Sequence, residues 1–293
     1  MAITIGAVSQ TLAISQADHR PPGNALDAPA LLRLWHIASL DAPTVAVTWS
    51  LAFARTVGVR LPGWVPILLA LVTWAVYISD RLLDARSAMR RGRMNRLRQR
   101  HLFHWKHRSV FALLDLGAGC VGVWIILSFM PAGARERNSL LALVGAVYFS
   151  CVHTHRRFHP FFRKEIAVAL LFTVGCALPT FGRAAETSGS FVATIAFFVT
   201  IAWLNCHAIE FWESGQTMAN PQVFSASWMI AVTGFIAAAV LHSTHFGEAD
   251  LMATGAASAL LLAFLDRMRG RMTPLALRVT ADLVLLTPLM LAF

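Results

Sequence analysis

Charged residues are scarce in this chain of 293 residues: they make up 14% of it, while hydrophobic residues make up 57%. Soluble domains carry about 25% charged and roughly 45–50% apolar residues, so this chain has too few charges to cover a water-facing surface. Its mean hydropathy is +0.60. The shortage excludes disordered, coiled-coil and ordinary soluble folds. It predicts a polytopic membrane protein whose apolar surface faces the lipid bilayer.

Cysteine patterns that bind metals are also missing. The chain has four cysteines, which fall within or at the ends of apolar stretches and form no CxxC pair: Cys120, Cys151, Cys176 and Cys206. They therefore predict neither a zinc site nor a disulfide framework. A secretory signal peptide with a basic start is not expected, because no Lys or Arg precedes Arg20.

Apolar runs close to the 20 residues or so that a helix needs to cross a membrane recur along the chain. The predicted fold is all-α, with about nine transmembrane helices in one bundle. The helices are expected at about 35–55, 63–79, 109–130, 139–152, 166–182, 191–208, 222–242, 250–265 and 278–293. We expect residues 1–29 to form a cytoplasmic N-terminal tail and residues 30–293 to form a single transmembrane domain.

Basic residues are distributed unevenly between the two predicted sides of the membrane. One side holds only Arg55, Arg60, Arg135, Arg137 and Arg183, which leaves 20 of the 25 Lys and Arg on the other side (25 − 5). Lys and Arg accumulate in cytoplasmic loops, so the richer side is predicted to be cytoplasmic. This orientation predicts a multi-pass protein of the cell inner membrane with a cytoplasmic N-terminus. The site-bearing cytoplasmic loops are then about 80–108, 153–165, 209–221 and 266–277.

The basic charge does not predict a nucleic-acid-binding protein, because most of it lies in short loops between predicted spans. Carboxylates recur near two predicted helix ends, about 130 residues apart (210 − 80), which indicates a weak internal repeat of four helices. Asp80 and Asp84 lie in "YISDRLLDAR", and Glu210 and Glu213 lie in "NCHAIEFWES". Each pair projects from one helix face and suits Mg²⁺ shared with a phosphate. Ordinary ion pairs with arginine explain the same residues.

These features resemble the UbiA-type intramembrane prenyltransferase superfamily, whose members have nine helices and acidic motifs at the ends of helices 2 and 6. "SDRLLD" is similar to the DRxxD half of the first motif, and "NCHAIEFWE" stands in the place of the second. Tyr148 followed by "THRRFHP" is similar to a Tyr…Lys-Arg…Pro segment, and "NRLRQR" to an Asn-Arg segment. Val76 and Tyr77 occupy the positions of the family's leading Asn and Asp.

The resemblance implies transfer of an isoprenyl group from its diphosphate to an unidentified lipophilic or aromatic acceptor in the membrane. It implies Mg²⁺ as cofactor, held by Asp80, Asp84, Glu210 and Glu213. It implies diphosphate binding by Arg96, Arg156, Arg157, Lys164 and Asn205. Tyr77 and Tyr148 are the implied catalytic residues.

Two other interpretations remain open. A non-catalytic or transport protein on the same fold is one, because Asp41, Asp115 and Asp282 fall inside predicted spans and intramembrane carboxylates often mark proton paths. They are scattered over three predicted helices, which gives transport no further support. A histidine-metal membrane oxidase is the other, because His101, His104 and His107 recur at every third position. An amphipathic helix at the membrane interface explains the same histidines.

Overall fold

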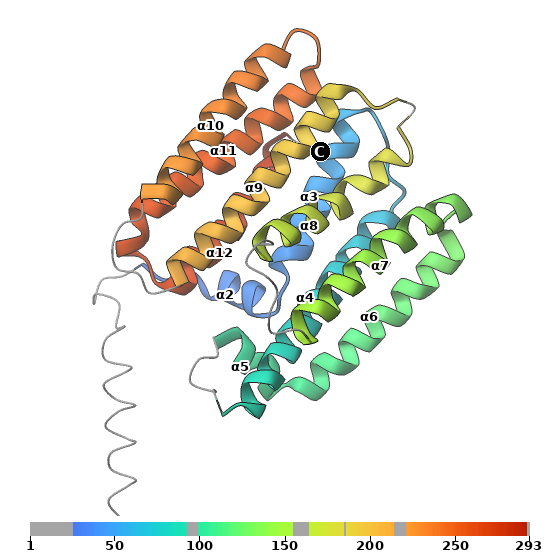
Figure 1. Cartoon of the computed structure of the whole chain (residues 1–293), viewed down its shortest axis with the longest axis vertical. Coiled ribbons are helices and arrows are strands. Elements are labelled where there is room, and N and C mark those ends of the chain that lie inside the picture. Colours follow the sequence, from blue (N-terminus) through green and yellow to red (C-terminus); the bar gives the residue numbers. More distant parts are fainter. Residues whose placement is uncertain (1–25, 93–98, 155–163, 185, 214–220, 292–293) are drawn as a thin grey trace, which may run out of the picture.

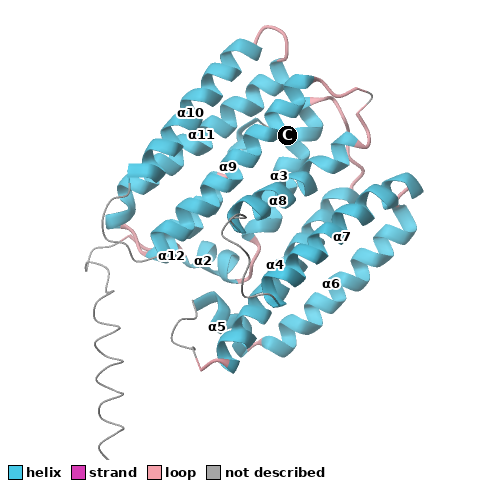
Figure 2. Cartoon of the chain, viewed as in Figure 1, coloured by secondary structure: helices cyan, strands magenta, loops and turns pink. Residues whose placement is uncertain are grey.

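The computed structural model describes residues 26–92, 99–154, 164–184, 186–213 and 221–291. These residues form helices joined by short connections, and they contain no strand beyond a lone parallel bridge between Leu26 and Met272 (Figures 1 and 2). The prediction of an all-α fold is confirmed.

The helices differ in length, from three residues to 27. In chain order they are α2 (Ala30–Ile37), α3 (Asp41–Thr56), α4 (Trp64–Arg90), α5 (Gln99–Lys106), α6 (Arg108–Phe129), α7 (Ala132–Thr154), α8 (Lys164–Phe181), α9 (Gly189–Glu213), α10 (Pro221–Leu241), α11 (Phe246–Met268), the 3-10 helix η2 (Arg269–Arg271), α12 (Pro274–Val284) and the 3-10 helix η3 (Thr287–Leu291).

Seven helical segments of the described chain are long and apolar enough to cross a membrane, which supports the prediction of a multi-pass membrane protein. They lie at 64–90, 108–129, 164–181, 189–213, 222–241, 246–271 and 274–291. The bent pair α2 and α3 adds an eighth if it is counted as one span. The predicted count of about nine is not established. Helix α7, at 139–152 in the prediction, has 23 residues but opens with Arg135, Glu136 and Arg137 in its first turns.

The first predicted span, 35–55, is not one helix. It is divided into α2 and α3, which meet at an angle of 87°. Pro43 lies in the first turn of α3 and has no N–H to donate to the carbonyl of Ser39, four residues earlier, which favours a helix break at this point. Ser39 has a φ of 64°, in the left-handed region that residues other than glycine seldom adopt.

Helix ends also differ from the prediction. Helix α4 continues to Arg90 instead of ending near 79, so Asp80 and Asp84 lie inside it. Helix α9 likewise continues to Glu213, and both changes turn parts of the predicted loops into helix. Helix α12 begins before 278, at Pro274, because the Thr273 side chain accepts a hydrogen bond from the Ala276 N–H and caps it.

Helix α3 lies at the centre of the bundle and packs against α4, α8, α11 and α12 (Figure 1). Its Trp49 and Phe53 are fully buried with Phe191 and Phe198 of α9. The rings of Trp49 and Phe198 stack at 3.8 Å between centroids. The Trp49 indole also donates to the Leu285 carbonyl, 2.8 Å away. This aromatic core fixes α3, and with it Asp41, relative to α9 and α12.

Contacts at the two ends of the bundle agree with the predicted grouping of loops. At one end Glu213 of α9 approaches Arg100 of α5 and Arg278 of α12. At the other end the Arg183 guanidinium lies 5.5 Å from the centroid of the Trp64 ring. The first end therefore joins two of the loops that the charge distribution places in the cytoplasm and the start of the last predicted span. Its cytoplasmic orientation remains a prediction.

Candidate functional site

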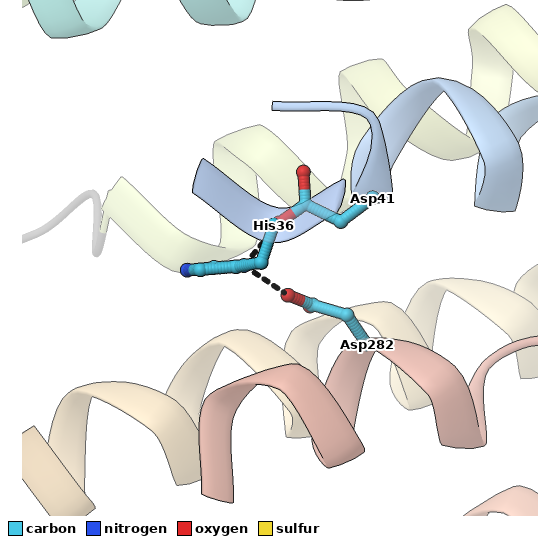
Figure 3. A group of neighbouring side chains, drawn as sticks. All are labelled: His36, Asp41 and Asp282. Carbon is cyan, nitrogen blue, oxygen red and sulfur yellow. Dashed lines mark ion pairs between the residues drawn. The ribbon is translucent and has the colours of Figure 1, made fainter. Parts of the chain in front are cut away.

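A buried cluster of one histidine and two carboxylates lies at the break between α2 and α3 (Figure 3). His36 Nδ1 is 2.7 Å from Asp41 Oδ2 and 3.6 Å from Asp282 Oδ2 of α12. In the part of the chain that the structure describes, no other three His, Cys, Asp or Glu side chains bring ligand atoms within 4.8 Å of one another. The expectation that Asp41 and Asp282 are scattered is wrong, because the 87° bend turns Asp41 toward α12.

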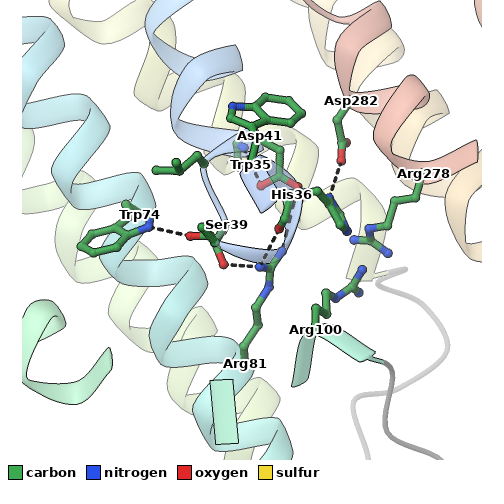
Figure 4. A network of polar contacts seen from close by, with 12 residues as sticks. Trp35, His36, Ser39, Asp41, Trp74, Arg81, Arg100, Arg278 and Asp282 are labelled. Carbon is green, nitrogen blue, oxygen red and sulfur yellow. Dashed lines mark hydrogen bonds and ion pairs between the residues drawn. The ribbon is translucent and has the colours of Figure 1, made fainter. Parts of the chain in front are cut away.

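Arg81 of α4 connects this cluster to the helix break (Figure 4). Its side chain is 3% exposed, and its Nη1 donates to the Ser39 hydroxyl and, at 3.5 Å, to the carbonyl oxygen of His36. Its Nη2 lies 4.0 Å from Asp41 Oδ2. A buried arginine is stable only when its charge and donors find partners, so Arg81 holds the break and the Asp41 carboxylate in one arrangement.

Two further side chains hold the break from the outside. Trp74 of α4 donates from its indole nitrogen to the Ala38 carbonyl at 3.0 Å. His104 Nε2 of α5 lies 3.1 Å from the Ser39 hydroxyl oxygen. His104 Nδ1 lies 2.9 Å from the Arg100 carbonyl oxygen, to which it can only donate, so the neutral ring accepts from Ser39 at Nε2.

The environment of His104 favours its neutral form. Burial, reinforced by the charges of Arg81 and Arg100, lowers the pKa of His104 to about 4. The hydrogen bond to the Arg100 carbonyl and the negative charge of Asp41 act in the opposite direction but are weaker. The predicted histidine triplet therefore contributes a structural residue to the break.

Glu213, one of the predicted metal ligands, is engaged by arginines. Arg278 Nη1 donates to both carboxylate oxygens of Glu213, at 2.9 and 3.0 Å. Arg100 Nη1 lies 3.8 Å from Oε1. The sequence suggested ion pairing as the plain explanation of this residue, and the structure supplies the two arginines, from α5 and α12.

Two carboxylates, from α4 and α8, are among the electrostatic neighbours of Tyr148 of α7. Asp80 of α4 and Glu165 of α8 act electrostatically on its hydroxyl, and so does Cys206 of α9. Cys206 in turn has Glu165 and Glu210 among its electrostatic neighbours. That the acidic ends of α4 and α9 share one site stays a prediction.

The remaining predicted site residues occupy varied positions. Tyr77 of α4 has the Arg81 guanidinium 5.8 Å from its ring centroid. Asn205 of α9 is 5% exposed and donates to Asp282 Oδ1 at 3.4 Å. Lys164 begins α8, and its carbonyl accepts from the Tyr148 hydroxyl at 3.5 Å. Asp84 lies inside α4, one turn beyond Asp80. Three predicted diphosphate ligands lie outside the described residues: Arg96, Arg156 and Arg157.

The four predicted metal ligands offer carboxylate oxygens, the donors that Mg²⁺ prefers. Among the described residues they do not form a set of three ligand atoms within 4.8 Å. Mg²⁺ keeps several ligands from water or substrate phosphate, so the donor type of Asp80, Asp84 and Glu210 suits it, and their joint binding of the ion stays a prediction. Glu213 fits less well, because two guanidinium groups already neutralise it.

Sequence reasoning missed His36, Arg81 and Arg278. Arg81 lies between Asp80 and Leu82 in the "SDRLLD" segment, and its side chain is buried. Pro43 after Asp41 is a helix-start signal that marks the break. Nothing in the local sequence connects His36 to Asp282, which is 246 positions away. Comparisons with family models, curated proteins and solved structures give no match for this chain.

Proposed function

We propose that this protein is a membrane prenyltransferase that moves an isoprenyl group from its diphosphate to a lipophilic or aromatic acceptor in the bilayer. One observation carries the proposal: the Tyr148 hydroxyl of α7 donates to the Lys164 carbonyl at the start of α8, at 3.5 Å, so a predicted catalytic residue and a predicted diphosphate ligand from different helices meet. The resemblance to the UbiA-type superfamily adds the expectation that the acidic segments of α4 and α9 share a diphosphate beside these two residues. The nine-helix arrangement and the internal repeat belong to the same proposal.

The chemistry follows from the charges around Tyr148. Asp80, Asp84 and Glu210 would hold Mg²⁺, and the ion would supply positive charge to a departing diphosphate. Tyr148 and Tyr77 donate hydrogen bonds to phosphate oxygens, which carboxylates cannot do. These two are the only tyrosines in the chain.

Basic and amide groups complete the proposed diphosphate site. Glu213 orients Arg278 through its two hydrogen bonds and acts as a positioning residue. Asn205, anchored to Asp282, provides an amide beside the site. The remaining phosphate contacts come from Arg96, Arg156, Arg157 and Lys164, as the resemblance implies.

Incubation with labelled isoprenyl diphosphates and Mg²⁺, followed by analysis of the lipid phase, tests the proposal. Membranes that contain the protein and their native lipids supply the acceptor. We expect a labelled product that forms at least tenfold more slowly with Asp80→Asn or Glu210→Gln. Glu186→Gln is the matched control, because Glu186 is an exposed carboxylate in the connection between α8 and α9. Absence of product at every chain length, with well-folded protein, contradicts the proposal.

Transport is the second candidate function, and the broken helix favours it. Discontinuous helices beside buried carboxylates form ion and substrate sites in many transporters. Proteoliposomes loaded with a pH-sensitive dye separate the two functions. A prenyltransferase produces labelled lipid without proton flux, whereas a proton-coupled transporter produces flux that Asp41→Asn abolishes.

A further inference from the structure

The cluster at the helix break has the composition of a transition-metal site. We propose that His36, Asp41 and Asp282 bind one divalent transition-metal ion, such as Zn²⁺. The proposal does not depend on the proposed prenyl transfer, and none of the three residues belongs to the predicted Mg²⁺ ligands. It rests on the orientation, burial and charge of the three side chains (Figures 3 and 4).

The two carboxylates are oriented in the same manner. Asp41 Oδ1 accepts from the Ala42 N–H at 3.0 Å, and Asp282 Oδ1 accepts from Asn205 Nδ2 at 3.4 Å. Each carboxylate therefore uses one oxygen for a protein hydrogen bond and presents the other, Oδ2, toward His36 Nδ1. Outer donors of this kind orient metal ligands in known sites.

His36 supplies an independent indication of a ligand. Its side chain is 1% exposed, and its Nδ1 has no hydrogen-bond partner among the described residues. The Asp41 oxygen is close, at 2.7 Å, but it does not lie in line for a hydrogen bond from the ring. A buried nitrogen without such a partner costs free energy unless another group binds it.

Arginines stand near the two Oδ2 atoms but do not close on them: Arg278 acts electrostatically on Asp282 and lies beside the cluster (Figure 4). In the described part of the chain, no Lys or Arg nitrogen lies within 4.0 Å of Asp282. Arg81 reaches Asp41 only at 4.0 Å, and its other donor group binds Ser39 and the His36 carbonyl. Two carboxylate oxygens, one buried and one half-buried, face each other across one imidazole and repel unless a cation, either a protonated His36 or a metal ion, lies between them.

The ligand types select the class of metal. One imidazole nitrogen and two carboxylate oxygens suit Zn²⁺, Mn²⁺ or Fe²⁺, whereas Mg²⁺ and Ca²⁺ prefer oxygen alone. Three protein ligands leave a fourth position for water or substrate, as in catalytic zinc sites. Because α2, α3 and α12 each contribute one ligand, the metal would also fix the helix break in place.

Metal titration of the chelator-treated, detergent-purified protein tests the proposal. We expect one equivalent of Zn²⁺ to remain after dialysis, and Co²⁺ in its place to give visible absorption bands of a low-coordinate nitrogen–oxygen site. Asp282→Asn should lose stoichiometric binding. Asn205→Leu, which removes an outer donor, should weaken it by about 10–100-fold. Asp115→Asn is the matched control. Asp115 lies on α6, outside the cluster, and its carboxylate accepts a hydrogen bond from Ser79 of α4. This variant should bind the metal as the unmutated protein does.

Metal binding by the unmutated protein tests the proposal even if a variant fails to fold. Less than 0.1 equivalent of Zn²⁺ or Co²⁺ after dialysis, or binding that Asp282→Asn and Asp115→Asn reduce equally, overturns the proposal. In that case a protonated His36 alone lies between the two carboxylates. Neither result depends on isoprenyl diphosphate, so failure here and failure of the proposed transferase activity are distinguishable.

Discussion

Ser39 combines an unfavourable backbone conformation with two buried hydrogen bonds. Its φ of 64° costs about 1 kcal/mol for a residue with a Cβ, and its hydroxyl joins Arg81 to His104. Contacts of the surrounding side chains offset this cost in free energy and hold the break in one conformation. Strain of this kind often accompanies functional sites.

Ser39→Ala should therefore destabilise the protein more than Ser39→Gly. Both variants leave Arg81 and His104 without their shared partner, a loss of about 1–3 kcal/mol. Glycine also relieves the left-handed strain, so it should be the milder change by about 1 kcal/mol. Urea unfolding in detergent micelles measures the difference. A larger loss with glycine than with alanine contradicts the assigned role of the backbone.

His104 makes stability depend on pH. Its pKa is about 4 in the folded protein and 6.5 in the unfolded chain, so between these values only the unfolded state binds the extra proton. The free energy of unfolding should therefore fall as the pH drops from 6.5 to 4. His104→Gln, which lacks the titrating ring, should lose less stability between pH 7 and pH 4.5. An equal loss in both proteins would show that His104 does not become charged on unfolding.

At the scale of helices, close packing depends on glycine at a few positions. A Cβ at Gly234 of α10 would approach the Ala256 Cβ of α11 to 2.9 Å and the Phe197 ring of α9 to 2.3 Å. Small residues at such contacts let helix backbones approach in membranes, where there is little hydrophobic drive for association. By contrast, Gly117 of α6 has no heavy atom within 4 Å of the added carbon.

Gly234→Ala should push α10 away from α11 and destabilise the protein by about 1–3 kcal/mol. Gly117→Ala should be neutral or slightly stabilising, because alanine is the better helix former. Thermal unfolding midpoints of the two variants in the same detergent provide the comparison. Equal midpoints for both variants would mean that α10 and α11 pack less closely than the structure shows.

Helix positions could be predicted from the sequence wherever an apolar run is long, because such a run must be buried in lipid or in the protein core. The segments 109–130 and 166–182 lie within two residues of α6 and α8. Apolar content cannot locate the end of a helix that continues into polar sequence, as α4 does through Asp84. Apolar content also gives no sign of the helix break at Ser39, which Pro43 indicates.

The candidate site was predictable only in part. The carboxylates of α4 and α9 stand out because each pair recurs in a local pattern, and their role in a site stays a prediction. His36, Arg81 and Arg278 were not, since their partners come from distant parts of the chain and only folding brings them together. Long-range pairs such as His36 with Asp282 leave no local trace in one sequence.

For the whole molecule, the grouping of loops predicts how the chain lies in the membrane. A reporter fused after Arg100 should be cytoplasmic, and one fused after Glu136 should be external, because 20 of the 25 Lys and Arg lie on the first side (25 − 5). Paired enzyme reporters active on opposite sides of the membrane give this result directly. An external location for the first fusion would reverse the orientation and place the candidate site away from cytoplasmic diphosphates.

Binding of an isoprenyl diphosphate is the central claim, and thermal unfolding of the detergent-purified protein tests it most directly. A ligand at a hundred times its dissociation constant that binds only the folded state adds about 2.7 kcal/mol of stability. We predict a stabilisation of this size with Mg²⁺, a smaller one without it, and none with the matching isoprenyl alcohol. Equal stabilisation by alcohol and diphosphate, or none by diphosphates of any chain length, would contradict a diphosphate site at Asp80, Tyr148 and Glu210.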